Sequence, residues 1–372
     1  MLYYIDKSCA QLLNAGDEEA VEFLEQLILH RKKCKNFVIA DRGVLRELGK
    51  SEKLSSVVRA YCRILENRSS EFRMILAKSR KYYKVVSECK GDRVTEQNGQ
   101  VIIQLSVKEG NQADFTDRCI LLAESTDDIE FYKQIGRYYL EKSSISRMNL
   151  SFEEMIGGGD TTGTRLEHLI EEGQRQCLCI LDSDKTYFGA DCGSTLQKAR
   201  DVMTAKGTEN VELYPLFVHE IENLIPVGLL DKICANMPDT RPGIAFLKFL
   251  LEKDASQSSP VFYFDYKKGI PKDRYILKDS SKKDSVKKFR RLEGYRNYWK
   301  KYIEAYGVKM EETVSEPVIP GVCEKVLKHA VRYLKERCCQ ETGIEDSYIH
   351  TVWMELGAVI AAWGCTGNRI AA

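Results

Sequence analysis

The feature that most constrains the fold is a regular alternation of apolar, strand-like stretches and helical patterns between residues 116 and 235. The four strand-like stretches are RCILLAE (118–124), SRMNLSFEEMI (146–156), CLCILD (177–182) and VELYPLF (211–217). Strands separated by helices predict a parallel sheet with helices on its faces. In such sheets, functional residues gather at the carboxyl ends of the strands.

Regions of different character flank this alternation. Residues 1–115 mix helical and strand-like stretches, and the pair Asn98-Gly99, between the stretches KYYKVVSEC and GQVIIQLSVKE, predicts a β-hairpin. Residues 236–372 are basic and mainly helical. The predicted fold is therefore α/β. It has a Rossmann-like parallel sheet over 116–235, an N-terminal α/β region that we interpret as an interaction domain, and a helical C-terminal region.

Composition excludes several classes of protein. The net charge of +1 over 372 residues gives no overall attraction to nucleic acid or membrane. No segment approaches the roughly 20 apolar residues of a membrane span, and the N-terminus lacks the pattern of a signal peptide. The 13 cysteines are odd in number and include no C-x-x-C, so the sequence predicts neither a disulfide framework nor a zinc site. We expect a cytoplasmic protein without membrane contact.

Acidic residues follow three of the four predicted strands. They are Glu124 and Asp128 after the first strand, Asp182 and Asp184 after the third, and Glu220 and Glu222 after the fourth. Because the carboxyl ends of parallel strands meet at one edge, these charges should repel one another unless a divalent cation lies among them. Carboxylate oxygens suit Mg²⁺ or Mn²⁺.

The spacing of Asp182 and Asp184 also fits a shared cation. Side chains two residues apart lie on one face where the backbone is extended. Both carboxylates can then bind one metal, or each can bind one of a pair. Two such metals can activate a water and stabilise the leaving oxygen of a phosphodiester.

These motifs resemble the Toprim domain, which topoisomerases, primases and nucleases share, over residues 118–224. ILLAESTDDIEFY is similar to the motif with a strand-end glutamate, and CILDSDK to the Asp-x-Asp motif. IGGGD is similar to the glycine-rich turn after the second strand, and HEIENLIP resembles a Glu-x-Glu-Asn segment of the OLD-like nuclease branch. The family commonly has a glycine after the glutamate, whereas this chain has Ser125.

The resemblance implies a metal site and a reaction. Glu124, Asp182 and Asp184 would bind metal, Glu124 would also be a candidate general base, and Glu220 or Glu222 would complete the site.

Three features next to these acids each have a functional and a structural interpretation. Asp128 would bind metal or simply stabilise the start of a helix. Lys185 would stabilise phosphate charge as a catalytic cation or serve solubility. Gly158 and Gly159 would form a tight turn or let a phosphate backbone approach closely.

A strongly basic segment over 267–301 is interleaved with aromatic residues. The pattern predicts an amphipathic helix with aromatic residues mostly inward and basic residues toward nucleic acid. The candidate nucleic-acid-binding residues are Lys282, Lys283, Lys287, Lys288, Arg290 and Arg291.

The leading hypothesis is a Mg²⁺-dependent endonuclease that cuts DNA or RNA. OLD-like nucleases often carry an ATPase on the same chain, but this sequence has no G-x-x-x-x-G-K-[ST] motif. By analogy we expect a separate ATPase subunit, such as the HerA-like translocases of two-component phage-defence systems. The alternatives are a topoisomerase- or primase-like strand transferase, and a non-catalytic module that binds a regulatory cation. The sequence is compatible with assembly of this chain into a homo-oligomer.

Overall fold

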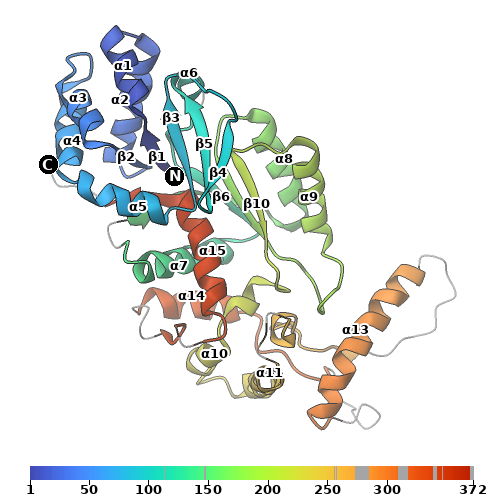
Figure 1. Cartoon of the computed structure of the whole chain (residues 1–372). Helices are drawn as coiled ribbons and strands as arrows, with labels where there is room; N and C mark the ends of the chain where they lie inside the picture. The colour runs from blue at the N-terminus through green and yellow to red at the C-terminus, as the bar shows by residue number, and fades with distance from the viewer. Residues whose placement is uncertain are drawn as a thin grey trace.

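A computed structural model of the chain contains two large sheets, built mostly of parallel strands, and a small sheet of two antiparallel strands, with helices around them (Figure 1). The expected α/β class, with a parallel sheet flanked by helices, is confirmed. The structure describes residues 1–112, 114–145, 148–254, 256, 258–272, 285–308, 317–337, 342–345 and 347–368, without the side chains of 285–290.

The first sheet has five strands in the order β2-β1-β3-β5-β4. The hairpin predicted at Asn98-Gly99 is present, with φ angles of 53° and 75° at the two turn residues. Its first strand is not KYYKVVSEC, as expected, because that stretch forms β3, which runs parallel to β5. The strands are β1 (Leu2–Ile5), β2 (Phe37–Ala40), β3 (Lys81–Val86), β4 (Val94–Gln97) and β5 (Gln100–Ser106).

Helices pack around this first sheet (Figure 1). Asp6, Asp17 and Ser55 precede three of them, and each side chain accepts a hydrogen bond from a backbone N–H of the first turn. The helices are α1 (Lys7–Ala15), α2 (Glu18–Lys32), α3 (Arg42–Lys50), α4 (Ser56–Asn67), the 3₁₀ helix η1 (Ser69–Glu71), α5 (Phe72–Lys78) and α6 (Val107–Asn111).

The second sheet has four parallel strands in the order β10-β9-β6-β8. The chain passes from β6 outward to β8 and then returns to β9 on the other side of β6. The strand order therefore reverses between β6 and β9, which is the place where open α/β sheets bind ligands. The strands are β6 (Cys119–Ala123), β8 (Phe152–Ile156), β9 (Cys177–Leu181) and β10 (Val211–Pro215).

The predicted strand over 146–156 is divided in two. Only β8 joins the parallel sheet, whereas β7 (Met148–Leu150) pairs antiparallel with β11 (Cys365–Gly367) near the end of the chain. The helices between the strands are α7 (Thr126–Lys142), the 3₁₀ helix η2 (Gly159–Thr161), α8 (Thr162–Glu172) and α9 (Ser194–Lys206).

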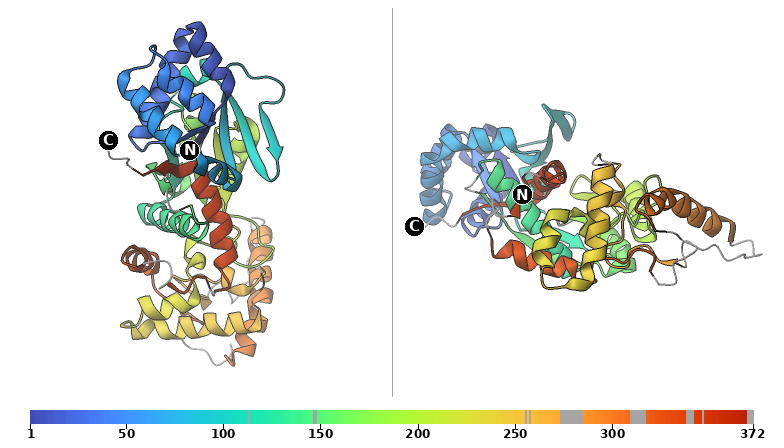
Figure 2. Two further views of the ribbon diagram at one scale, coloured as in Figure 1. Left: turned by 60° about the vertical axis from the view of Figure 1, so that its left-hand side comes forward. Right: turned by 90° about the horizontal axis from the view of Figure 1, so that it is seen from below.

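The chain after β10 is mainly helical. The buried helix α15 packs along α7, where Gly136 and Gly357 allow close approach. A Cβ at Gly136 would lie 2.6 Å from Leu150 Cδ1 of β7, and a Cβ at Gly357 would lie 2.5 Å from Tyr139 Cβ of α7. In the right-hand view of Figure 2, α13 (orange to brown) lies at one end of the molecule, away from the sheets. The elements are η3 (Ile221–Leu224), α10 (Val227–Ile233), η4 (Pro238–Thr240), α11 (Arg241–Lys253), η5 (Pro260–Phe262), α13 (Ser285–Ala305), α14 (Val326–Lys335) and α15 (His350–Gly364).

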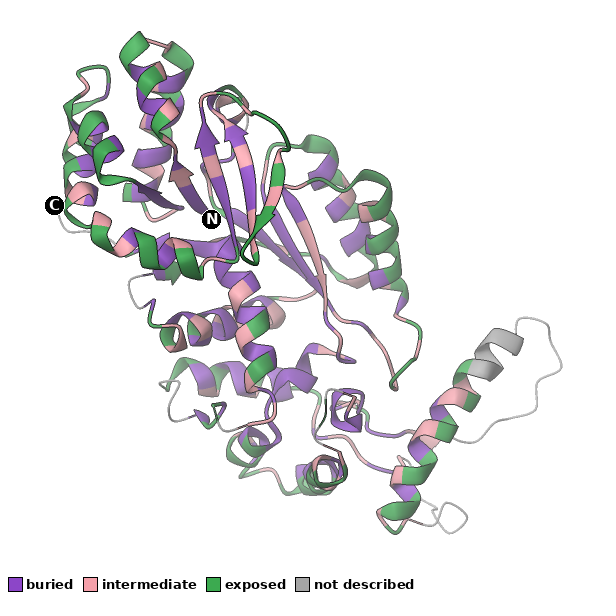
Figure 3. Ribbon diagram, viewed as in Figure 1, coloured by how far each residue is buried: buried purple, intermediate pink, exposed green. Residues whose placement is uncertain are grey.

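Strands β6 and β9 are buried on both faces (Figure 3). Alternate residues of β6 enter different cores. Leu121 belongs to a large apolar cluster that extends from Met1 to Cys365, and Leu122 to a smaller cluster with α8 and α9. The large cluster also contains the side chains between the two sheets. No helix in the described ranges has the length and apolar character needed to cross a membrane.

Candidate functional site

The predicted acidic residues converge where the strand order of the second sheet reverses. Glu124 directly follows β6, and Asp182 directly follows β9. Leu122 pairs with Cys179, so the two strands leave the sheet at nearly the same level. Their carboxylates therefore lie at the same edge, as the spacing of the motifs predicts.

Ser125 and Asp128 form the start of α7. The Ser125 N–H and hydroxyl donate to the two oxygens of Asp128, at 2.9 and 2.7 Å, and the Asp128 N–H donates back to the hydroxyl at 3.2 Å. This reciprocal capping box gives Ser125 a structural reason at the position where the Toprim pattern has glycine. Asp128 stabilises the helix start and also lines the acidic cavity.

The turn after β9 places Asp182 and Asp184 differently from the expectation. Asp184 has a φ of +54°, in the left-handed region, so the predicted extended backbone is wrong at this residue. The turn is fixed by Ser183, whose hydroxyl donates to the Val218 carbonyl, and by the Asp184 N–H, which donates to the His219 carbonyl at 2.8 Å. Asp182 lines the cavity, whereas Asp184 packs against Gly193, where a Cβ would lie 2.0 Å from its Oδ2.

Glu220 and Glu222 do not lie at a strand end, because β10 stops at Pro215; Glu220 is the N-cap of η3 and Glu222 lies within η3. Asn223 holds this segment: its side chain accepts from the Glu220 N–H at 3.0 Å and donates to the carbonyls of Val261 and Phe264. The asparagine of HEIEN therefore has a structural role.

Lys267 is a residue of the site that sequence reasoning did not single out. Its ammonium lies 2.9 Å from Glu220 Oε2 and 3.2 Å from Glu222 Oε1. Glu222 is 4% exposed, and its other oxygen, Oε2, has no hydrogen-bond partner in the part of the chain that the structure describes. One lysine therefore serves two glutamates and leaves a buried carboxylate oxygen available.

The carboxyl groups repel one another, and their pKa values show it. Burial and the neighbouring charges of Asp184 and Asp128 raise the pKa of Glu124 to about 7. Burial, together with Glu220, raises the pKa of Glu222 to about 7 despite Lys267. Burial and the surrounding glutamates also raise the pKa of Asp182 well above its usual range. The cluster therefore favours an additional positive charge.

A cavity of about 410 Å³ opens over these residues. Its floor is acidic, and one wall is the start of α14. The lining residues are Glu124, Ser125, Asp127, Asp128, Asp182, Ile221, Glu222, Lys267, Glu324, Lys325, Leu327 and Lys328.

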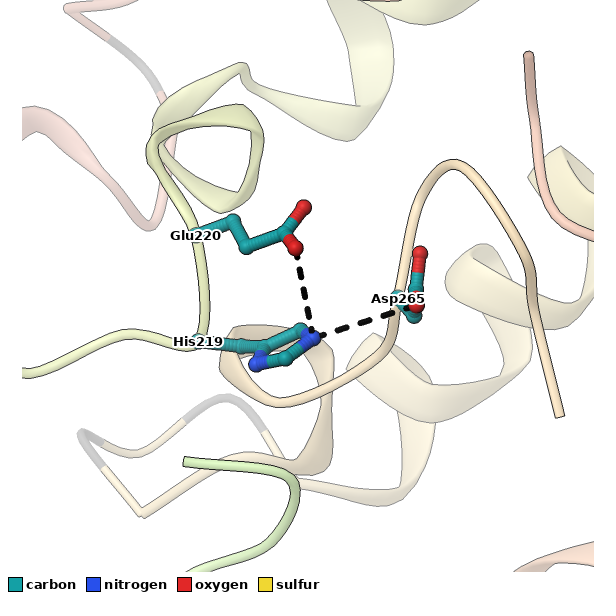
Figure 4. Close-up of side chains that lie close together, drawn as sticks. All are labelled: His219, Glu220 and Asp265. Atoms are coloured by element: carbon teal, nitrogen blue, oxygen red, sulfur yellow. Dashed lines mark ion pairs between the residues drawn. The ribbon is translucent and has the colours of Figure 1, made fainter. Parts of the chain in front are cut away.

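His219 joins Glu220 to Asp265 beside this cavity (Figure 4). His219 Nε2 lies 3.8 Å from Glu220 Oε1 and 4.0 Å from Asp265 Oδ2. Burial raises the pKa of Asp265, but hydrogen bonds from His219 and from the N–H groups of Lys268 and Lys267 together lower it below its usual value. Asp265 thus forms the turn that presents Lys267.

His, Cys, Asp and Glu side chains can bind a metal ion. In the described ranges one group of three such residues, His219, Glu220 and Asp265, has its possible ligand atoms within 4.8 Å of one another. The predicted ligands Glu124, Asp182 and Asp184 form a more open set. An open set fits Mg²⁺, which keeps several waters and commonly uses one or two carboxylates. The donors are all oxygen except for His219, and the available oxygen of Glu222 points to a cation.

The structure brings the glycine turn to the site but leaves Lys185 at its border. Gly158 and Gly159 have φ angles of 75° and 66°, and the Gly158 N–H donates to the Glu124 carbonyl at 3.3 Å. The Lys185 N–H donates to the Ser183 hydroxyl, and Lys185 is not among the cavity-lining residues.

The basic helix α13 is attached to the turn that carries Asp184. Trp299 is buried and donates from Nε1 to the Thr186 carbonyl at 3.0 Å, and Tyr187 lies against Gly294. The charge of Arg291 lowers the pKa of Asp184, although burial raises it more.

The other basic candidates are less fully described. Lys282 and Lys283 lie outside the described residues, and the side chains of Lys287, Lys288 and Arg290 in α13 are likewise outside them.

No protein-family model, curated protein or solved structure matches the chain.

Proposed function

We propose that this protein is a metal-dependent nuclease that hydrolyses nucleic-acid phosphodiester bonds at a Toprim-like acidic site. The observation that carries the proposal is the convergence of carboxylates from three separate segments at the reversal point of a parallel sheet, with raised pKa values and an available oxygen on buried Glu222. The order of the motifs along the chain supports the same proposal.

Glu124, Asp182 and Asp184, with Glu220 or Glu222, would hold Mg²⁺ or Mn²⁺. Bound there, the cation would supply an activated water and neutralise charge on the phosphodiester. Asp128 stands beside them, but the Ser125 donors occupy both of its oxygens, so its first role is to fix α7 next to Glu124.

The chain's own residues provide acid–base and electrostatic functions. Glu124, with a pKa of about 7, is suited to accept a proton near neutral pH. Lys267 lies in the same cavity, where its ammonium can stabilise negative charge on a phosphate. Its ion pairs with Glu220 and Glu222 hold it in place without substrate.

We further propose that a separate ATPase subunit, resembling a HerA-like translocase, acts with this chain in antiviral defence. The support is the absence of a P-loop motif from the sequence, together with the resemblance to OLD-like nucleases. Co-purification of the chain with a co-expressed ATPase of this kind tests the pairing.

The test of catalysis uses purified protein with plasmid DNA and with transfer RNA, in Mg²⁺, Mn²⁺ or EDTA. We expect metal-dependent fragments, and a loss of about 10²-fold or more in Asp182→Asn and Asp184→Asn, the scale of one electrostatic stabiliser. Asparagine tolerates the left-handed backbone at position 184, so the fold should survive. Asp191→Asn, an exposed change in the same loop, is the matched control.

Other results would count against the nuclease. Relaxed but unbroken circles would indicate strand transfer. Intact substrates under all conditions, also with the ATPase present, would leave a cation-binding module. Equal activity in all three variants would show that these aspartates are not the site.

A further inference from the structure

Two lysines at the start of α14 also line the acidic cavity. This wall consists of Lys325, Leu327 and Lys328, with Glu324 before them, whereas Glu124, Asp182 and Glu222 form the acidic floor. Both lysines are exposed, and no ion pair involves either of them within the described residues. Two lysines without an ion pair among the described residues thus line the same cavity as a cluster of carboxylates.

These lysines lie where helix stability alone would not place them. Lys325 is the N-cap of α14 and Lys328 belongs to the first turn, which has no acidic residue and no side-chain cap. The N-terminus of a helix favours negative charge and Ser, Thr, Asp or Asn caps. Cations at this end are unfavourable for the helix by itself. Together with first-turn N–H groups other than that of Val326, which donates to the Cys323 carbonyl, they suit an anion.

The floor independently indicates a ligand. Glu222 is 4% exposed and keeps an unpartnered oxygen, and it lines the same cavity as the two lysines. A ligand that satisfies both sides must offer a cation to the floor and an anion to the wall. A phosphate group together with a divalent cation has this character.

We propose that Lys325, Lys328 and the first turn of α14 bind a phosphate of the nucleic-acid backbone next to the bond that is cut. This inference rests on the proposed function and names a contact of its substrate. Arg291 on α13 is close enough to Asp184 for its charge to act on that carboxylate, so α13 brings a further basic side chain near the acids.

The experiment measures binding of a fluorescent oligonucleotide, single-stranded and duplex, by anisotropy in EDTA at several KCl concentrations. The variants are Lys325→Ala, Lys328→Ala and the double variant. The matched control is Lys50→Ala with Lys108→Ala, two exposed lysines on α3 and α6. Thermal melts confirm that each variant is folded.

Replacing a lysine that contacts a phosphate should reduce the magnitude of the slope of log K against log[KCl]. The expected reduction is about 0.9 on duplex or about 0.7 on single strands. In the double variant the magnitude of the slope should fall by twice this amount. The kcat/KM for cleavage in Mg²⁺ should fall together with the affinity. The control variant should have the same slope and the same kcat/KM as the parent.

Three results would overturn the inference. If the parent cleaves and all slopes are equal, the wall is not a phosphate site although the nuclease stands. If inorganic phosphate competes through these lysines while oligonucleotide slopes stay equal, the wall binds free phosphate only. If the parent binds and cleaves no nucleic acid with either metal, both proposals fall.

Discussion

Single carboxyl groups decide the electrostatics of the site. Glu124 and Glu222 both have a pKa of about 7 in the fold, against 4.5 for an ordinary glutamate, because burial and neighbouring carboxylates penalise the charged form. Their protonated forms therefore stabilise the folded chain. This contribution is complete below about pH 4.5 and is lost as the pH rises through 7.

We expect the metal-free protein to lose stability between pH 5.5 and pH 8 for this reason. Urea unfolding in EDTA should give a smaller free energy of unfolding at pH 8, and Mg²⁺ should restore it there by binding the folded state. Glu222→Gln cannot ionise at this position, so its stability should fall less over the same range. A parent chain that is equally stable at both pH values would contradict the raised pKa values.

At this scale the sequence identifies the acids but not their partners. Glu124 is visible because it follows β6 closely, and Asp182 and Asp184 because they follow β9 closely, so local pattern and parallel geometry suffice. Lys267 and Asp265 reach the site from a later loop, and only tertiary structure brings them to Glu220. The left-handed φ of Asp184 has no sequence signal beyond the tolerance of aspartate for it.

Among the elements, α13 and the turn after β9 form one unit. The Trp299 indole is buried at this junction and donates to the Thr186 carbonyl, two residues beyond Asp184. Tyr298 lies over Tyr187, with ring centres 5.8 Å apart. The basic helix is thus held at a fixed place beside the acidic site.

Substitution of Trp299 should separate packing from binding. Trp299→Ala should lower the free energy of unfolding by about 3–5 kcal/mol because it removes a large buried side chain. Trp299→Phe loses the N–H bond and some packing, at about 1 kcal/mol. Both should weaken oligonucleotide binding, measured by anisotropy.

Trp363→Phe is the control, since it loses a similar N–H bond, to Glu212, far along the chain from α13. It should cost similar stability and leave binding unchanged. Normal binding by Trp299→Ala would show that α13 needs no anchor.

Elements were predictable where a local apolar pattern marks them, whereas the pairing of strands was not. Strands β6 and β9 and their helices follow from local apolar patterns. The division of 146–156 into β7 and β8 does not, because Ser151 donates to the Gly364 carbonyl and β7 pairs with β11. The partner of β3 was missed because a parallel pairing leaves no mark at a turn.

Over the whole molecule, the two sheets share one interior. Lys81 on β3 is 8% exposed, lies 3.4 Å from Glu212 on β10, and stands over the Trp363 ring of α15 at 3.9 Å. Tyr83 donates to the Asn210 side chain at 2.8 Å beside it. Both sheets should therefore unfold together.

Lys81→Ala tests this coupling, because all three tryptophans lie after residue 298. Leaving Glu212 without its cation should lower the free energy of unfolding by about 3 kcal/mol, read from tryptophan fluorescence in urea. Lys84→Ala on the same strand, whose pair with Asp6 is more exposed, should cost less than about 1 kcal/mol. If the fluorescence transition of Lys81→Ala has the same midpoint as that of the parent, the two sheets unfold independently.

The packing of α15 on α7 and the pairing of β11 with β7 also set an order of events during synthesis. The helix that begins beside Glu124 leaves the ribosome long before the segments that cover it. At about 5–20 residues per second, this delay is on the order of ten to forty seconds. A nascent chain therefore cannot complete the packing around α7 until α15 and β11 have also emerged.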